Sequence, residues 1–215
     1  MKQLFFLAIA VAIALNACKS GDSKTSQTIS KNTTNKNLDS VFAKYYEDRL
    51  RLFPLEATGN GDSRYNDLLP IDFTDSYRAT LNDFFSSNFN AVTKIEREGL
   101  SDQQKTYYDI FKREMEMSIE GLGNRDNLIP FQQFRGLTLT MGQLGSGEGN
   151  QPFKTAKDYD DWLKRITAFG NWADSAIVYF NKGMASGYVL PKTLVTKIIP
   201  QMDAMVTTDA TKSIL

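Results

Sequence analysis

The sequence contains no histidine, only one cysteine and no excess charge of either sign. Without histidine, the chain cannot form a Ser-His-Asp or Cys-His catalytic group, an imidazole-ligated zinc site, or a haem site with a proximal histidine. A single cysteine allows no disulfide within the chain, so the core alone has to stabilise the fold. The 25 basic and 25 acidic side chains cancel, so the basic excess typical of nucleic-acid-binding proteins is missing. Any catalysis by this chain would depend on carboxylates, Lys, Tyr or Ser.

The residues that are present describe an ordinary globular protein with an export signal. Hydrophobic residues make up 41% of the chain and charged residues 23%, which excludes disordered, collagen and coiled-coil compositions. After Lys2, residues 4–15 read LFFLAIAVAIAL, a run of apolar residues without a charge. A helix that spans a bilayer needs roughly 20 such residues. The shorter run therefore predicts a signal-peptide core.

The apolar run ends at Leu15-Asn16-Ala17-Cys18, which resembles the bacterial lipobox. In that signal, cleavage falls between Ala17 and Cys18, and the cysteine thiol then carries a lipid. The alternative is a general secretory signal with an incidental cysteine. The lipid is favoured because the only cysteine of the chain stands at the required position, directly after a small residue. We expect residues 1–17 to be a lipoprotein signal peptide and Cys18 to be the attachment point to the membrane.

Residues 18–37 are predicted to be a flexible tether. From Lys19 to Asn37 the chain reads KSGDSKTSQTISKNTTNKN, with Ile29 as its one large apolar residue. Such a segment cannot bury enough surface to offset the entropy lost on ordering. Lys19, rather than Asp, follows the cysteine, and by resemblance to bacterial sorting signals this favours the outer membrane, on its periplasmic or surface face. Residues 38–215 are then the folded domain.

Apolar residues at three- and four-residue spacing predict an all-α domain, a bundle-like array of about five long helices. In chain order, the first helix is expected from Leu38 to Phe53-Pro54, the second from Thr74-Asp75 to Gly99, and the third from the capping box of Ser101 and Gln104 to Gly121. The fourth is expected to start at Thr155 with Asp158. The fifth is expected to start at Pro191 and to be kinked or interrupted at Pro200. The stretch from Leu128 to Thr140 is ambiguous, and we expect it to be an extended loop.

A glycine-rich stretch from Gly142 to Gly149 has the general look of a phosphate-binding loop. A Walker-type loop needs Lys and then Ser or Thr after its last glycine, to reach the phosphates and the magnesium. Here Glu148 follows Gly147 and would repel phosphate. We interpret the stretch as a mobile surface loop; if it has a role, that role is as a lid or a substrate-contacting loop.

The acidic clusters predict neither a metal site nor an acid-base pair. A calcium loop that began at Asp158 would need glycine at its sixth position and glutamate at its twelfth. Leu163 and Phe169 occupy these positions. Glu114, Glu116 and Glu120 do not make a convincing acid-base pair. Glu116 and Glu120 lie one turn apart, as expected on a solvated helix face. The sequence therefore yields no catalytic, cofactor-binding or metal-binding residue.

Four stretches, in order, resemble the bacterial DUF885 family. They are Phe53-Pro54-Leu55-Glu56-Ala57-Thr58 followed by Gly61-Asp62-Ser63-Arg64-Tyr65-Asn66-Asp67; Leu100-Ser101 leading to Tyr107-Tyr108-Asp109; Pro152-Phe153-x-Thr155-x-x-Asp158-Tyr159-x-x-Trp162-Leu163-x-Arg165; and Gly183, Gly187 and Pro191. The resemblance covers nearly all of the chain after the tether. Members of the DUF885 family are longer than this chain, largely helical, and resemble zinc metallopeptidases of the carboxypeptidase or dipeptidase kind.

The resemblance places the metal in a part that this sequence does not contain. The family's metal motif, a His-Glu-x-x-x-Gly-His-like stretch, lies in its carboxy-terminal half, and Leu215 closes this sequence soon after the fifth helix without a termination pattern. We therefore expect the amino-terminal helical half of a larger membrane-anchored hydrolase, a fragment that is inactive alone. Zinc and a peptide substrate are implied only for the full-length protein. The alternative is a non-enzymatic helical lipoprotein that binds a partner or ligand at the cell envelope.

Overall fold

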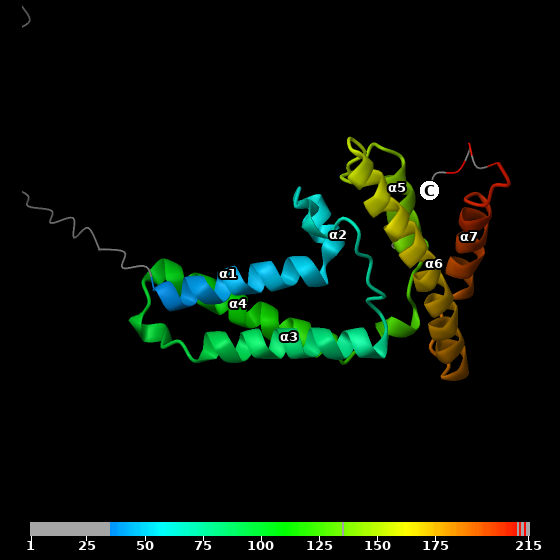
Figure 1. The fold of residues 1–215 in the computed structure, drawn as a ribbon. Helices are drawn as coiled ribbons and strands as arrows, with labels where there is room; N and C mark the ends of the chain where they lie inside the picture. The colour runs from blue at the N-terminus through cyan, green and yellow to red at the C-terminus, as the bar shows by residue number, and fades with distance from the viewer. Residues whose placement is uncertain (1–34, 135, 210, 212, 214–215) are drawn as a thin grey trace, which may run out of the picture. The chain divides into compact units, whose positions relative to one another are not determined.

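The computed structural model describes residues 35–134, 136–209, 211 and 213 (Figure 1). The predicted signal peptide, the cleavage site at Ala17 and Cys18, and the predicted tether up to residue 34 lie outside the described residues. Within the described residues the chain is all-α and forms no strand. The α-helices are α1 (Lys36–Leu52), α2 (Pro54–Gly59), α3 (Asp75–Thr93), α4 (Asp102–Gly121), α5 (Leu137–Gly145), α6 (Ala156–Ala185) and α7 (Lys192–Asp203); short 3₁₀ turns cover Ser63–Tyr65 (η1), Arg97–Gly99 (η2) and Asp126–Leu128 (η3).

The five long helices predicted from the sequence are confirmed as α1, α3, α4, α6 and α7, with small changes at their ends. α1 begins at Lys36 rather than Leu38, because the Asn35 side chain accepts hydrogen bonds from the backbone N–H groups of Asn37 and Leu38. α3 ends at Thr93, and Gly99 instead closes the separate turn η2. Both predicted capping boxes are present, at the starts of α4 and α6.

The expectation of an extended loop over Leu128–Thr140 is wrong at both ends. The expectation of a surface loop over Gly142–Gly149 is wrong for its first four residues, which are helical. Leu128 ends η3, and α5 begins at Leu137. α5 also includes residues 142–145. Two of its side chains, Met141 (0% exposed) and Leu144, are buried in a core with Trp162. Threonine and glycine are weak helix formers, so this tertiary packing rather than local propensity stabilises α5.

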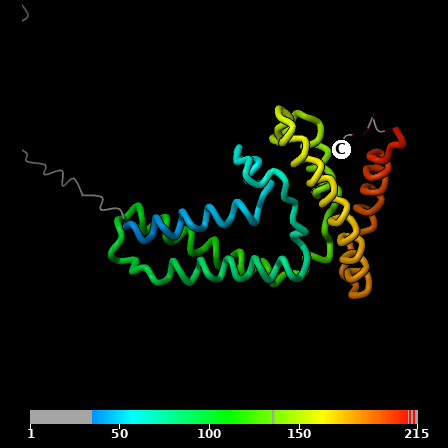
Figure 2. The backbone as a smooth tube through the Cα atoms, in the orientation of Figure 1, coloured from blue at the N-terminus to red at the C-terminus, as the bar shows by residue number. Residues whose placement is uncertain are grey.

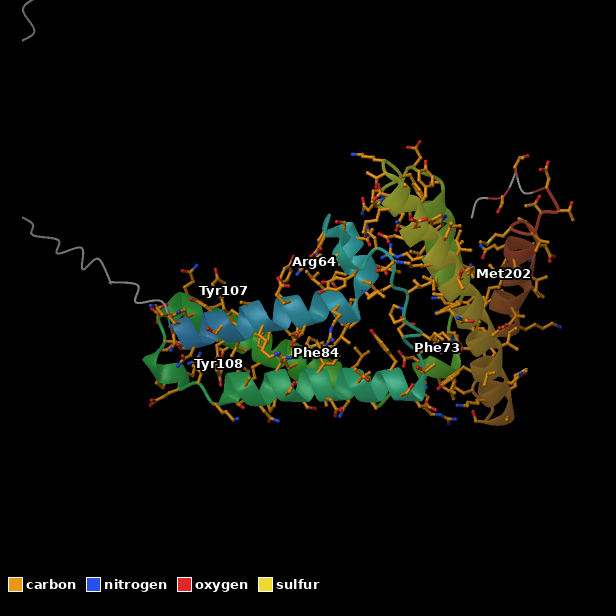
Figure 3. All side chains as sticks on the ribbon, viewed as in Figure 1. Arg64, Phe73, Phe84, Tyr107, Tyr108 and Met202 are labelled. Carbon is orange, nitrogen blue, oxygen red and sulfur yellow. The ribbon has the colours of Figure 1, made fainter. Side chains whose placement is uncertain are left out.

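Helices α1, α3 and α4 form a three-helix unit in which consecutive long helices run antiparallel (Figures 1 and 2). Tyr45 of α1 lies at its centre. Its ring stacks on Phe84 of α3 at 5.2 Å between centroids and meets Phe111 of α4 edge-on at 4.9 Å. The two faces of α4 differ as an amphipathic helix requires: Tyr108 is buried in this core, whereas its neighbour Tyr107 points outward (Figure 3).

The segment that follows α2 connects the three-helix unit to α6. Phe73 packs edge-on against two α6 rings, Trp172 at 5.4 Å and Tyr179 at 5.2 Å. The hydroxyl of Tyr179 accepts a hydrogen bond of 2.6 Å from the backbone N–H of Asp75, the first residue of α3. The start of α3 is therefore fixed against the carboxy-terminal half of α6.

The carboxyl end of α6 is closed by a Schellman motif. Gly187 has a φ of +72°, the left-handed conformation that glycine adopts without strain. The Tyr188 N–H then donates to the Gly183 carbonyl at 2.9 Å, and the Gly187 N–H donates to the Met184 carbonyl at 3.2 Å. This is the turn that contains the Gly183 and Gly187 pair of the sequence resemblance.

α7 follows this turn and buries none of its residues. Pro200 lies within the helix, where the sequence led us to expect a kink or interruption. Val195 is 40% exposed and Ile199 55% exposed, so α7 presents apolar side chains to solvent. None of the helices that the structure describes has the length and apolar character needed to cross a bilayer.

Candidate functional site

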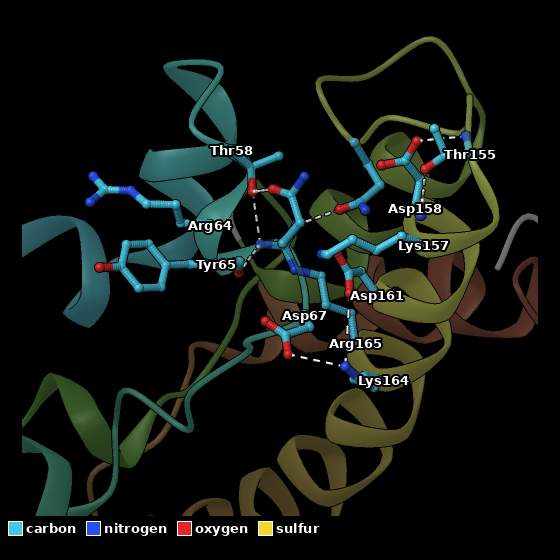
Figure 4. Close-up of polar contacts among 12 residues, drawn as sticks. Thr58, Arg64, Tyr65, Asp67, Thr155, Lys157, Asp158, Asp161, Lys164 and Arg165 are labelled. Atoms are coloured by element: carbon cyan, nitrogen blue, oxygen red, sulfur yellow. Dashed lines mark hydrogen bonds and ion pairs between the residues drawn. The ribbon is translucent and has the colours of Figure 1, made fainter.

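Arg165 of α6 is completely buried, and its side chain ties together segments that are far apart in the sequence (Figure 4). The guanidinium donates hydrogen bonds to oxygen atoms of five residues. These acceptors are Pro54 O (3.3 Å), Thr58 Oγ1 (2.7 Å), Tyr65 O (3.0 Å), Leu68 O (3.2 Å) and Gln151 Oε1. α2, η1 and the segment after η1 are thereby fixed to α6.

Among the residues that the structure describes, no carboxylate is hydrogen bonded to this guanidinium. Burial lowers the pKa of Arg165 to about 10, and the nearby carboxylates of Asp67 and Asp161 partly oppose this shift. The side chain therefore remains charged at neutral pH. Both carboxylates are paired with lysines instead: Lys164 Nζ lies 3.3 Å from Asp67 and 3.8 Å from Asp161, and Lys157 also pairs with Asp161 (Figure 4).

The Arg165 cluster joins two of the stretches that resemble DUF885. Pro54, Thr58 and Tyr65 come from the first stretch, and Arg165 ends the third. Because the guanidinium is buried and each of its three nitrogens donates to the protein, it positions these segments and is not available to a substrate. This role of Arg165 was not predicted from the sequence. A signal was present, since Arg165 follows Trp162 by three residues on the apolar face of its helix.

A groove lies beside this cluster. A cavity of about 350 Å³ is bounded by the end of α1, the start of α2, the segment before α3, the start of α5 and Trp172 of α6. A second hollow of about 340 Å³ is bounded by the segment before α3, η3 and the segment that follows η3. Asp72, Pro130 and Gly136 line both hollows, so the two adjoin one another.

Most of the charged side chains at this groove are paired within the protein. Glu56 accepts from Arg49, with the closest atoms 2.8 Å apart. Arg78 pairs with Asp126 at 3.0 Å and also donates to two backbone carbonyls. Asp72 is accessible to solvent, yet the surrounding walls partly desolvate its carboxylate, which raises its pKa; the Trp172 side chain and nearby backbone partly oppose this shift.

The carboxylates considered in the sequence analysis are dispersed into separate interactions. Glu114 accepts from the Tyr45 hydroxyl at 3.0 Å, and Glu116 pairs with two basic residues of its own helix. Asp158 accepts from the backbone at the start of α6, as a capping residue. Over the described part of the chain, no group of three His, Cys, Asp or Glu side chains is placed to hold a metal ion.

Comparison with known proteins gives one family. The family described as "Bacterial protein of unknown function (DUF885)" matches residues 54–214, more than half of the chain. Neither the curated proteins nor the solved structures contain a match to this chain.

Proposed function

Because the chain belongs to the DUF885 family, we propose that it is the amino-terminal helical half of a membrane-anchored, metallopeptidase-like hydrolase of the carboxypeptidase or dipeptidase type. The observation that supports this proposal most directly is the family match, which extends from the start of α2 to beyond the end of α7. In this role the helices form part of a substrate cleft, and we assign the groove beside Asp72 to that cleft.

The exposed apolar residues of α6 and α7 are consistent with this role. Ile177, Val178 and Met184 of α6 are all more than half exposed, and α7 buries none of its residues. A large exposed apolar surface on a soluble protein commonly marks an interface. We propose that these helices contact the part of the full-length protein that carries the metal.

The residues of this chain do not fit the zinc site that the family resemblance implies. Catalytic zinc usually takes three protein ligands that include histidine, and the sequence has none. Its only cysteine, Cys18, is proposed to carry the lipid. Carboxylate oxygens alone suit magnesium or calcium better than zinc. We assign no catalytic step to this chain and place the metal in the carboxy-terminal part.

We expect peptide hydrolysis only from a product that joins this chain to a carboxy-terminal part with the His-Glu motif. The assay is release of amino acids from a panel of dipeptides and oligopeptides, with and without a chelator. The matched control is the same longer product with the motif histidine replaced. Chelator-sensitive hydrolysis by the 215-residue chain alone would contradict the assignment. An inactive longer product would instead favour the non-enzymatic lipoprotein that binds a ligand or partner.

We also expect Cys18→Ser to release the protein from the membrane or to leave its signal uncleaved, because the lipid is attached through the thiol. Intact mass measurement and membrane fractionation check this result. Ser20→Ala changes a nearby small residue without affecting the thiol and should leave the protein lipidated. An unmodified, alkylatable Cys18 in the mature protein would exclude the lipid anchor.

A further inference from the structure

Of the residues that the structure describes, Asp72 is the one charged residue that lines both of the adjoining hollows of the groove. It lies in the segment between η1 and α3, one residue before Phe73, which is fixed against α6. The backbone around Asp72 is therefore held in place by Phe73, and its carboxylate is presented at the junction of the two hollows.

The basic side chain at the groove, Arg78, does not pair with Asp72. Glu56 is paired with Arg49, and Arg78 is paired with Asp126. Among the described residues, Asp72 takes part in no ion pair. The nearby carboxylate of Asp126 adds negative potential, and partial desolvation of Asp72 outweighs the hydrogen bonds that favour its charged form. A cation placed at this junction would reduce that desolvation cost.

The larger cavity next to Asp72 supplies an apolar surface for the rest of a ligand. Its walls include the side chains of Leu69, Pro130, Leu137 and Trp172. A cavity of about 350 Å³ lies within the range of small-ligand sites. The groove thus combines a negative charge at its junction with an apolar cavity beside it.

We propose that this groove binds an organic cation, with the ammonium or guanidinium group against the Asp72 carboxylate and the apolar body against Trp172 and Leu137. The amino terminus of a peptide and a basic side chain share this chemistry. The peptide origin of the cation rests on the proposed function, but the binding itself does not, because it requires neither a metal nor hydrolysis.

The test is titration of the purified 215-residue chain, in detergent, with 2-phenylethylamine and its uncharged analogue 2-phenylethanol. Tryptophan fluorescence reports binding, since Trp172 lines the cavity and the chain has two tryptophans. We expect the amine to bind about tenfold or more tightly than the alcohol, as charge-assisted contacts predict. This comparison uses the unmodified protein, so it does not depend on whether a variant folds.

Asp72→Asn should weaken binding of the amine about tenfold and leave binding of the alcohol unchanged. Asp83→Asn is the matched control, because Asp83 is exposed on α3 and does not line the groove. Equal affinity for amine and alcohol, no binding of the amine, or an unchanged affinity in Asp72→Asn would each overturn the proposal. These results are independent of the peptidase assay, so either proposal can fail alone.

A second titration distinguishes the two sources of the cation. Phe-Ala-amide presents a free amino terminus, and N-acetyl-Phe-Lys-amide presents a basic side chain with the amino terminus blocked. Binding of either that is weakened by Asp72→Asn supports the proposal and identifies the source. Failure of both to bind would overturn it for peptides of this kind.

Discussion

Arg165→Met is expected to lower the free energy of unfolding by about 3–4 kcal/mol, because it leaves the acceptor oxygens of Thr58, Leu68 and Gln151 without their donor. Each such group costs roughly 1–3 kcal/mol when it loses its hydrogen bond. The packing of methionine, and the removal of a desolvated charge, recover part of this loss. Equilibrium unfolding in urea, followed by circular dichroism, measures the change.

An apolar residue cannot simply replace this arginine. Buried ionic groups are sometimes exchanged for apolar ones without loss, provided that all partners are exchanged together. Here Pro54, Tyr65 and Leu68 accept through their backbone carbonyls, which no side-chain substitution removes. Arg165→Lys is not a conservative change either, since one ammonium group cannot reach the positions of three guanidinium nitrogens.

Arg113→Met is the control for this prediction. Arg113 lies on α4 with its side chain 63% exposed, and its one ion pair, to Glu116 at 3.5 Å, is on the surface. Such pairs contribute roughly 0–1 kcal/mol. If the two methionine variants were equally stable, Arg165 would not be the residue that holds α2 and η1 against α6.

Gly183→Ala should lower the free energy of unfolding by about 2–3 kcal/mol, through overpacking. A Cβ atom at this position would lie 2.6 Å from the carbonyl oxygen of Tyr188 and 2.9 Å from that of Leu128. Both atoms belong to the backbone, so neither can move away as the end of a flexible side chain could. The variant therefore has to separate η3 from α6 or open the turn that ends α6.

Gly170→Ala, in the same helix, is expected to raise the free energy of unfolding instead of lowering it. No atom lies within 4 Å of the Cβ that it adds, and the site is exposed. Replacing glycine with alanine inside a helix stabilises it by roughly 0.5–1 kcal/mol. Urea unfolding of both variants makes the comparison direct. A Gly183→Ala protein as stable as Gly170→Ala would show that the close approach of Leu128 does not constrain α6.

The long helices were predictable because their signals are local. The Ser101 and Thr155 caps each act on the backbone three residues later, and the apolar periodicity repeats within one or two turns. The short helices gave weaker signals. α5 contains three threonine and glycine residues in its first six, and its stability comes from Met141 and Leu144 in a core completed by Trp162.

The candidate site could not be predicted in the same way. Asp72, Glu56 and Trp172 carry no shared sequence pattern, and they line one cavity only because α2, the segment before α3 and α6 meet there. The resemblance to DUF885 identified the stretches around Thr58 and Arg165, but the contact between them was not evident from either stretch. The predicted lipid site at Cys18 is a sequence signal and remains a prediction.

The sequence alone determined the helical class, the positions of the long helices and the absence of histidine chemistry, because each depends on composition or on residues within one turn of each other. The tertiary structure decided which segments meet. The hydrogen bonds of Arg165 to Leu68 and Pro54 span 97 and 111 residues. Contacts of such separation depend on the packing of whole helices, and no local pattern of side chains specifies them.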